Sequence, residues 1–493
     1  MHDPRDCPVS TSEAAALAHA EQALWRTVAF YGDTLADLDA AIAADPGWGL
    51  ARIAKAVFLL TLTEPSMLPE ARRLLDAAEP LMAHANPRER QHFGAARLCL
   101  SGRWRDAGDG WDELLRQHPR DLLALNSAHL FDFYRGDALS LRARVARVLP
   151  EWPTDDPLRP FVLGMHAFGL EECNLHAQAE AAGRGALETC ARMPWAIHAV
   201  AHVMEMQGRH VEGVQFLRTR QPDWADDNGL SVHLWWHLAL FHLESLDTAS
   251  ALQLHDAQMA GAASVVNLQW LDGAALLWRL QLLGVEVGAR WQRLAQDWAQ
   301  PVQHAGHYSF NDCHALLALI GSGDMARAQA LLAAATAQAG NAGRKGTDRR
   351  AGAGADKQAD RPADRPADRP ADRGGDRRAD RRADRPTDNP ADNPAMAREV
   401  GLPLMHALLA HASGDPVAAV RLLYPLRRVA HHFGGSHAQR DLIDQTLLCA
   451  ACAAPQRDIK AIGRAVLNER QLAKASTPLT AHWAARLGLR ENA

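Results

Sequence analysis

Residues 101–119 read SGRWRDAGDGWDELLRQHP, and this stretch decides the fold of the chain. Its apolar side chains recur at intervals of three and four residues, which is the spacing of one face of an α-helix. They are Trp104, Ala107, Trp111 and Leu114. Gly102 stands before this helix, and Pro119 stands after it, where it cannot continue the helix. The stretch therefore predicts a tight turn, an amphipathic helix and a stop.

The same pattern matches the second half of a tetratricopeptide repeat, a unit of two helices joined by a turn. With Gly102 as the marker, equivalent turns recur along the chain at steps of 32 to 39 residues, apart from one step of 91. They lie near Gly32, Glu64, Gly102, Gly136, Asn174, Gly208, Leu246, Gly284, Gly323 and Gly414. This repetition predicts an all-α protein, a TPR-like α-solenoid in which about eleven helical hairpins stack as a right-handed superhelix.

The step of 91 residues contains a tract of different composition. From residue 343 to 395 the chain is rich in Asp, Arg and Pro, with Asp at every fourth position from Asp356 to Asp392. Its prolines exclude a continuous helix and its charges leave nothing to bury, so we expect a disordered insertion, with a charged tether for a partner as the alternative. Without these 53 residues the step is 38. The sequence thus predicts TPR-like repeats over 1–342 and their continuation with a C-terminal cap over 396–493.

The composition argues against several classes of protein. The net charge is −5 without a concentrated basic face, so we expect no nucleic-acid partner. There is neither a run of eighteen apolar residues nor a signal-like N-terminal segment, so we expect no membrane association and a cytoplasmic location. The seven cysteines, an odd number scattered through predicted helices, favour the same reducing setting. Neither a cofactor nor an oligomeric state follows from these observations.

Two predicted helices between residues 195 and 244 carry polar side chains on one face. Each has a pair of histidines four residues apart and a carboxylate further along, so that all three lie on one stripe. The residues are His198, His202 and Glu205 in the first helix and His233, Trp236, His237 and Glu244 in the second. In this type of repeat the first helix of each hairpin lines a concave groove, where we expect these side chains to face a ligand. Glu171 and Trp278 take groove positions in the neighbouring units.

Three interpretations of these candidate groove residues compete. A metal site would use neutral imidazoles and a carboxylate, although the HExxH order of many zinc enzymes is absent. Its candidate ligands are His198, His202, Glu205, His233 and His237. An organic-ligand site would use the His and Glu side chains as hydrogen-bonding or acid–base groups, with tryptophan rings as a stacking wall. In a structural role, the histidines would bond to carboxylates between helices and fix the register of the array.

Several segments, in this order, resemble the tetratricopeptide repeat protein 38 family, also called StaR-like. They are GLEEC (169–173), WAIHAVAHVMEMQGRHVEG (195–213), HLWWHLALFHLE (233–244), LLWRLQLLGVEVGARW (276–291) and FNDCHALLAL (310–319). The resemblance implies an all-helical repeat protein whose activity is not established, and it assigns no catalytic residue.

The first functional hypothesis is therefore a repeat protein that binds a small molecule or a partner's peptide segment in its groove. The second is an enzyme, with or without a metal, that uses the same residues. A purely structural scaffold is the third.

Overall fold

The structure is a computed structural model of the chain, and it describes residues 1–261, 266–298, 300–352 and 391–489. Over these ranges the regular elements are helices, accompanied only by isolated β-bridges. The prediction of an all-α protein is confirmed. No helix in the described part of the chain is both long enough and apolar enough to pass through a lipid bilayer.

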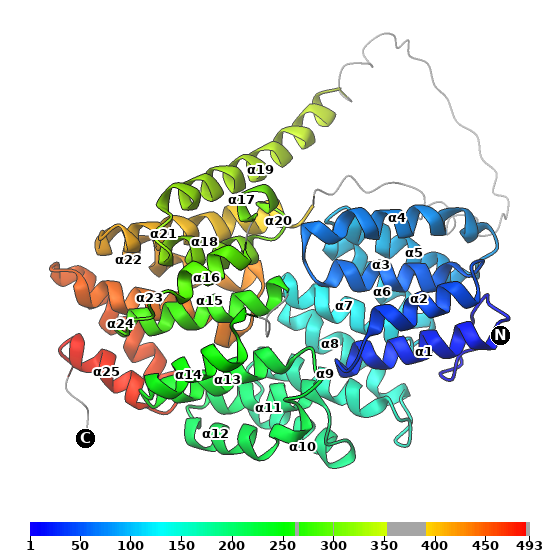
Figure 1. Ribbon diagram of the computed structural model, residues 1–493, viewed down its shortest axis with the longest axis horizontal. Coiled ribbons are helices and arrows are strands. Elements are labelled where there is room, and N and C mark those ends of the chain that lie inside the picture. The colour runs from blue at the N-terminus through cyan, green and yellow to red at the C-terminus, as the bar shows by residue number, and fades with distance from the viewer. Residues whose placement is uncertain (262–265, 299, 353–390, 490–493) are drawn as a thin grey trace, which may run out of the picture.

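Consecutive helices pack tightly as adjacent pairs, as Figure 1 shows. The pairs are α1 (Ala14–Ala29) with α2 (Thr34–Ala44), α3 (Gly49–Thr61) with α4 (Leu68–Ala78), α5 (Pro87–Leu100) with α6 (Trp104–Gln117), α7 (Leu122–Tyr134) with α8 (Ala138–Val148), α9 (Arg159–Glu172) with α10 (His176–Thr189), α11 (Pro194–Met206) with α12 (His210–Thr219), α13 (Ser231–Glu244) with α14 (Thr248–Gln258), α15 (Asn267–Leu282) with α16 (Arg290–Asp297), α18 (Ser309–Gly321) with α19 (Met325–Gly352), α21 (Leu402–Ala412) with α22 (Pro416–Leu426), and α23 (His437–Ala453) with α24 (Arg457–Ala473). Shorter helices are α17 (Pro301–His304), α20 (Asn393–Met396) and α25 (Pro478–Arg486). This pairing is consistent with an α-solenoid.

The turns within these pairs have left-handed backbone. Gly102, between α5 and α6, has φ of 77°, and the next N–H, of Arg103, donates to the carbonyl oxygen of Leu98 at 3.0 Å. This hydrogen bond closes the end of α5 as a Schellman motif, which requires a residue at positive φ. Every turn residue expected from the sequence has positive φ, except that Thr63 takes the place of Glu64. Glycine is frequent there because it lacks the Cβ atom that makes left-handed backbone costly.

The stretch that predicted the repeat supplies a buried helix face. Trp104, Ala107, Trp111 and Leu114 of α6 are all buried. The Trp111 ring stacks on Phe131 of α7 with centroids 6.0 Å apart and an angle of 18° between the planes. Burying a large side chain of this kind stabilises the fold by about 2–3 kcal/mol. The helix spacing read from the sequence is thus the spacing of residues that face the core.

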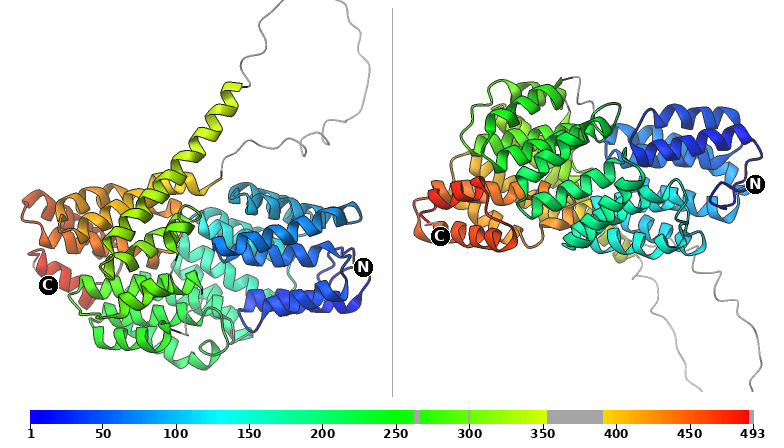
Figure 2. Two further views of the ribbon diagram at one scale, coloured as in Figure 1. Left: turned by 45° about the horizontal axis from the view of Figure 1, so that its top comes forward. Right: turned by 90° about the horizontal axis from the view of Figure 1, so that it is seen from below.

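The last hairpins lie against the middle of the chain. Helix α23 packs on α11, α15 and α21, and α25 packs on α13. In Figures 1 and 2 the C-terminal helices, in orange and red, lie beside the green helices of the middle of the chain. Lys474, just after α24, forms an ion pair of 2.6 Å with Glu244 of α13. At the other end, Asn311 of α18 donates to the backbone oxygen of Thr63 at 3.2 Å. Helices from the C-terminal part of the chain therefore pack on α11 and α13, whereas Thr63, just after α3, contacts α18.

The predicted insertion over 343–395 differs from the structure at both ends. Helix α19 continues to Gly352, because residues 343–352 contain no proline to stop it. At the other end the chain is held by Asn393, whose side chain accepts from the N–H of Ser309 and donates to the oxygen of Gly306, each at 2.7 Å. The disorder predicted for residues 353–390 lies outside the described residues.

Candidate metal centre

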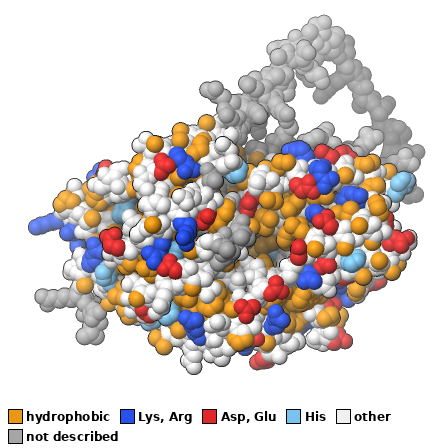
Figure 3. Space-filling view, viewed as in Figure 1, with side chains coloured by type: hydrophobic (Ala, Val, Ile, Leu, Met, Phe, Trp, Pro, Cys, Tyr) orange, Lys and Arg blue, Asp and Glu red, His pale blue; other side chains and the backbone are white. Residues whose placement is uncertain are grey.

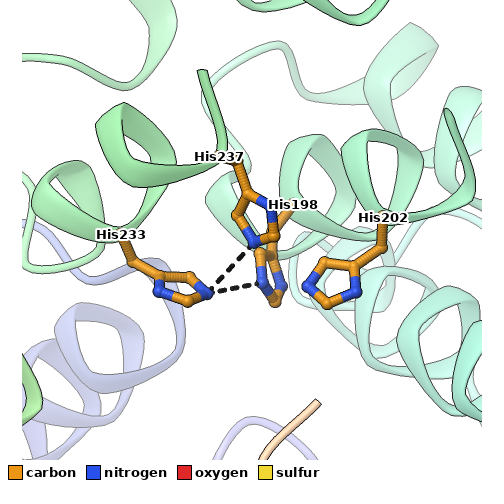
Figure 4. Close-up of side chains that lie close together, drawn as sticks. All are labelled: His198, His202, His233 and His237. Carbon is orange, nitrogen blue, oxygen red and sulfur yellow. Dashed lines mark hydrogen bonds between the residues drawn. The ribbon is translucent and has the colours of Figure 1, made fainter. Parts of the chain in front are cut away.

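Four imidazole rings meet between α11 and α13 (Figure 4). His198 and His202 come from α11 and His233 and His237 from α13, and one ring nitrogen from each lies within 4.8 Å of the others. We call them the four-histidine cluster. The Nε2 atom of His233 is 3.0 Å from Nε2 of His198 and 3.2 Å from Nε2 of His237. Two nitrogens that each lie about 2.1 Å from one ion are about 3.0 Å apart at a right angle and about 3.4 Å apart at a tetrahedral angle. These two spacings are those of neighbouring metal ligands.

Three of the four rings have a carboxylate behind them. The Nδ1 atoms lie 2.9 Å from Asp272 for His233, 3.1 Å from Glu205 for His237, and 3.4 Å from Glu171 for His202. A carboxylate on the far nitrogen of a metal-binding histidine fixes the tautomer and the ring orientation and makes the near nitrogen more basic. The arrangement therefore has both an inner set of nitrogens and an outer set of carboxylates.

The contact between His233 and His237 requires an ion or a proton between two ring nitrogens. When Nδ1 of each ring donates to an ionised carboxylate, each Nε2 atom carries a lone pair and no proton. Two lone pairs would then face each other at 3.2 Å. Either a metal ion lies between them or one Nε2 atom carries a proton, which requires a doubly protonated ring or a reversed tautomer whose carboxylate keeps its own proton. Burial raises the pKa of Glu205 to about 7, which favours the protonated carboxyl that would reverse the tautomer of His237.

The buried rings are held in the uncharged form that binds metals. Burial lowers the pKa of His202 to about 4 and holds the pKa of His198 and of His237 well below the usual value. Both ring nitrogens of His202, Nδ1 of His198 and both carboxylate oxygens of Glu171 are buried without a hydrogen-bond partner. Buried polar atoms in that state need an explanation. An ion bound to Nε2 of His202 would explain the unpaired nitrogens of this ring. The proton would then lie on Nδ1, which faces the carboxylate of Glu171.

A cavity of about 540 Å³ adjoins the four-histidine cluster, and His198, His233 and Asp272 form part of its wall. Much of the remaining wall is aromatic. Phe168 and Trp195 lie with ring centroids 5.2 Å apart, and further rings come from Phe30, Phe58, Phe133, Tyr134, Tyr308 and Phe310. Figure 3 shows a hollow with hydrophobic side chains near the centre of the face viewed in Figure 1. A small molecule in this cavity would lie beside two of the four rings.

The remaining residues expected in the groove have separate positions. Trp236 is buried and stacks on His233, with centroids 5.2 Å apart and an interplanar angle of 18°. Trp278 donates to the hydroxyl of Thr446 at 2.9 Å, and Glu244 pairs with the C-terminal hairpin. The structure thus brings Trp236 to the cluster together with the two carboxylates Glu205 and Glu171, whereas Glu244 and Trp278 lie elsewhere.

The expected groove residues are buried, except for His233, whose side chain is 16% exposed and lines the cavity. His202, Trp236 and His237 are fully buried, and Glu205 and Glu244 are about 5–6% exposed. Glu205 lies behind His237, in the position of an outer carboxylate. The reason is that α23 and α25, which follow much later in the chain, pack on α11 and α13. The sequence of a single hairpin does not contain this packing.

Sequence reasoning missed the role of Asp272. Its carboxylate lies on α15, one hairpin beyond His233, and it is the one acidic side chain of that helix. A single buried acid at an inner position of such a helix is a signal that could have been read. That its partner is His233 could not be read from the sequence, because tertiary packing sets the offset between α13 and α15.

A comparison of the chain with models of known protein families finds no match. The assignment of this site therefore depends on its geometry.

Proposed function

We propose that this protein is a metal-dependent enzyme, which binds one divalent transition-metal ion through the four-histidine cluster and a small molecule in the adjoining cavity. The supporting observation is the contact of 3.2 Å between Nε2 of His233 and Nε2 of His237, each ring backed by its own carboxylate. Imidazole nitrogens suit zinc, copper, iron and nickel. When bound, such an ion polarises a substrate oxygen or activates a water molecule.

The position of the cavity favours an enzyme over a structural metal site. Four imidazoles would close a tetrahedral zinc site, whereas a five- or six-coordinate ion on the same four rings keeps a position for water or substrate. His198 and His233 belong both to the cluster and to the wall of the cavity. A molecule in the cavity would therefore have direct access to the ion.

The first test is the metal content of the native protein purified without a histidine tag. We expect one transition-metal ion per chain by inductively coupled plasma mass spectrometry, and the same stoichiometry when metal-stripped protein is reloaded with Co²⁺ or Zn²⁺. A protein that holds no metal and takes up none of Co²⁺, Zn²⁺, Fe²⁺ or Cu²⁺ would show that protons on the rings and carboxyl groups satisfy the cluster. In that case its role is structural.

The outer carboxylates give a second prediction. Asp272→Asn is expected to weaken Co²⁺ binding by roughly 10- to 100-fold, because an amide can present N–H to His233 and favour the tautomer that cannot bind the ion. A competition titration against a chelator measures this change. The control is Asp247→Asn, which alters a similar contact of 3.0 Å between Asp247 and His242 outside the cluster. Equal Co²⁺ affinity in the two variants would contradict a positioning role for Asp272.

We further propose that the hairpins form a TPR-like right-handed superhelix related to the tetratricopeptide repeat protein 38 family. The support is the regular spacing of the left-handed turns together with the tight pairing of consecutive helices. An experimental structure would measure the handedness directly.

A further inference from the structure

We infer that the cavity beside the four-histidine cluster binds an uncharged, largely apolar small molecule that directs one oxygen-bearing group toward His198 and His233. The direction of this polar end and the exclusion of a cation rest on the proposed function, whereas the apolar character of the ligand and the exclusion of an anion follow from the cavity wall alone.

The size and lining of the cavity fit a molecule with an apolar body. Its volume of about 540 Å³ lies within the roughly 300–1,000 Å³ of pockets that enclose drug-sized ligands. Aliphatic side chains fill the wall between the aromatic rings; they are Leu62, Leu130, Leu230, Val266, Leu268 and Leu271. Contact with such walls removes apolar ligand surface from water, worth about 25 cal/mol for each Å².

The tyrosine hydroxyl groups in the wall are already bonded within the protein. The Tyr134 hydroxyl donates to the backbone oxygen of Thr61 at 2.7 Å, and the Tyr308 hydroxyl donates to the backbone oxygen of Tyr134 at 3.1 Å. Asn228 donates to the oxygen of Ala29 at 3.3 Å. A ligand with many polar groups along its body would lose hydrogen bonds to water without replacing them, which costs free energy for each group.

The charged side chains of the wall disfavour an anion. Arg26 is the one arginine or lysine among the described lining residues, and its guanidinium is paired with Asp37. The other charged lining residues are Asp227, which is exposed, and Asp272, which is bound to His233. An anionic ligand would meet two carboxylates and one arginine that already pairs with Asp37, so little would compensate for its desolvation.

A metal ion on the cluster would disfavour a cationic ligand. A divalent ion on four neutral imidazoles would repel a cation at this short range. Asp272, Glu205 and Glu171 lie behind the rings, and the negative charge of those that are ionised would reduce the attraction of the ion for an anion. A neutral oxygen, such as that of an alcohol, aldehyde or ketone, can approach the ion without an unbalanced charge. The polar end of the ligand therefore belongs at this end of the cavity.

The test uses two fluorescent probes of equal ring size, 9-anthracenemethanol and anthracene-9-carboxylate, titrated into the metal-loaded full-length protein. Probe fluorescence anisotropy reports binding. We expect the alcohol to bind with a Kd at least about tenfold below that of the carboxylate, which corresponds to about 1.4 kcal/mol. If the carboxylate binds as tightly as the alcohol, or if neither Kd is below about 100 µM, the inference is overturned.

Variants locate the binding in this cavity. Leu130→Trp places a larger side chain in the wall and is expected to weaken binding of the alcohol at least tenfold. Leu139→Trp is the matched control, because Leu139 is 63% exposed and lies outside the cavity wall. Leu268→Trp is a second filling variant from a different helix, should Leu130→Trp fail to fold by circular dichroism. Unchanged binding in a folded filling variant would place the probe elsewhere and overturn the inference.

A parallel titration of chelator-treated protein separates this inference from the proposed function. If the protein takes up no metal but binds the alcohol in preference to the carboxylate, the proposed function fails and the cavity inference stands. If the protein holds one metal ion per chain but shows no preference for the alcohol, the cavity inference fails and the metal centre stands.

Discussion

Replacement of both His233 and His237 by alanine is expected to lower the metal content from one ion per chain to less than about a tenth. The affinity for Co²⁺ should fall by more than about a hundredfold, because the loss of an outer carboxylate alone costs roughly 10- to 100-fold and this variant removes two inner nitrogens. The two rings are suited to this test because their Nε2 atoms lie 3.2 Å apart and each carries its own carboxylate. Elemental analysis and chelator competition measure the change.

The matched control is His242→Ala. His242 lies on the same helix α13, but its ring contacts Asp247 at 3.0 Å and takes no part in the cluster. This variant should keep one ion per chain. If the double variant also kept its ion, the cluster would not be the binding site. If instead the wild-type protein held no metal and the double variant lost thermal stability, the histidines would have the structural role of bonding carboxylates between helices.

The second large effect is expected for Gly136→Ala, in the turn between α7 and α8. Gly136 has φ of 66°, and a Cβ atom built there would lie 1.6 Å from the backbone oxygen of His431. Left-handed backbone costs a residue with a Cβ atom about 1–2 kcal/mol, and forcing extra atoms into a packed site costs a further 1–3 kcal/mol. We expect the free energy of unfolding to fall by about 3 kcal/mol or more, measured by urea denaturation.

Gly284→Ala separates the two contributions. Gly284, between α15 and α16, has φ of 82°, and no atom lies within 4 Å of the Cβ position. This variant should therefore show only the backbone cost of about 1–2 kcal/mol. An equal loss of stability in both variants would mean that residues near His431 do not pack on the turn between α7 and α8.

The elements of the fold could be predicted because they depend on residues that are close in the chain. A glycine such as Gly102 takes left-handed backbone at no steric cost, and apolar residues three and four apart form one helix face. The same spacing put His198 beside His202 and His233 beside His237, so each half of the site could be read before the halves were seen together. The end of α19 was missed because composition alone places the start of a tract poorly.

The composition of the site was decided only by the tertiary structure. Asp272 is 39 residues from its partner His233, and Lys474 is 230 residues from its partner Glu244. The two halves of the cluster meet within hydrogen-bonding distance because of the offset between α11 and α13, and helices from the ends of the chain cover them to form the cavity. Each hairpin adds a small rotation to the one before, and the sum of these rotations decides which distant helices meet. By itself the sequence determined the helices, their turns and the polar face of each helix, because these depend on residues that are close in the chain. Which faces meet, and whether they enclose a metal ion beside a cavity, depends on packing between residues that are far apart in the chain.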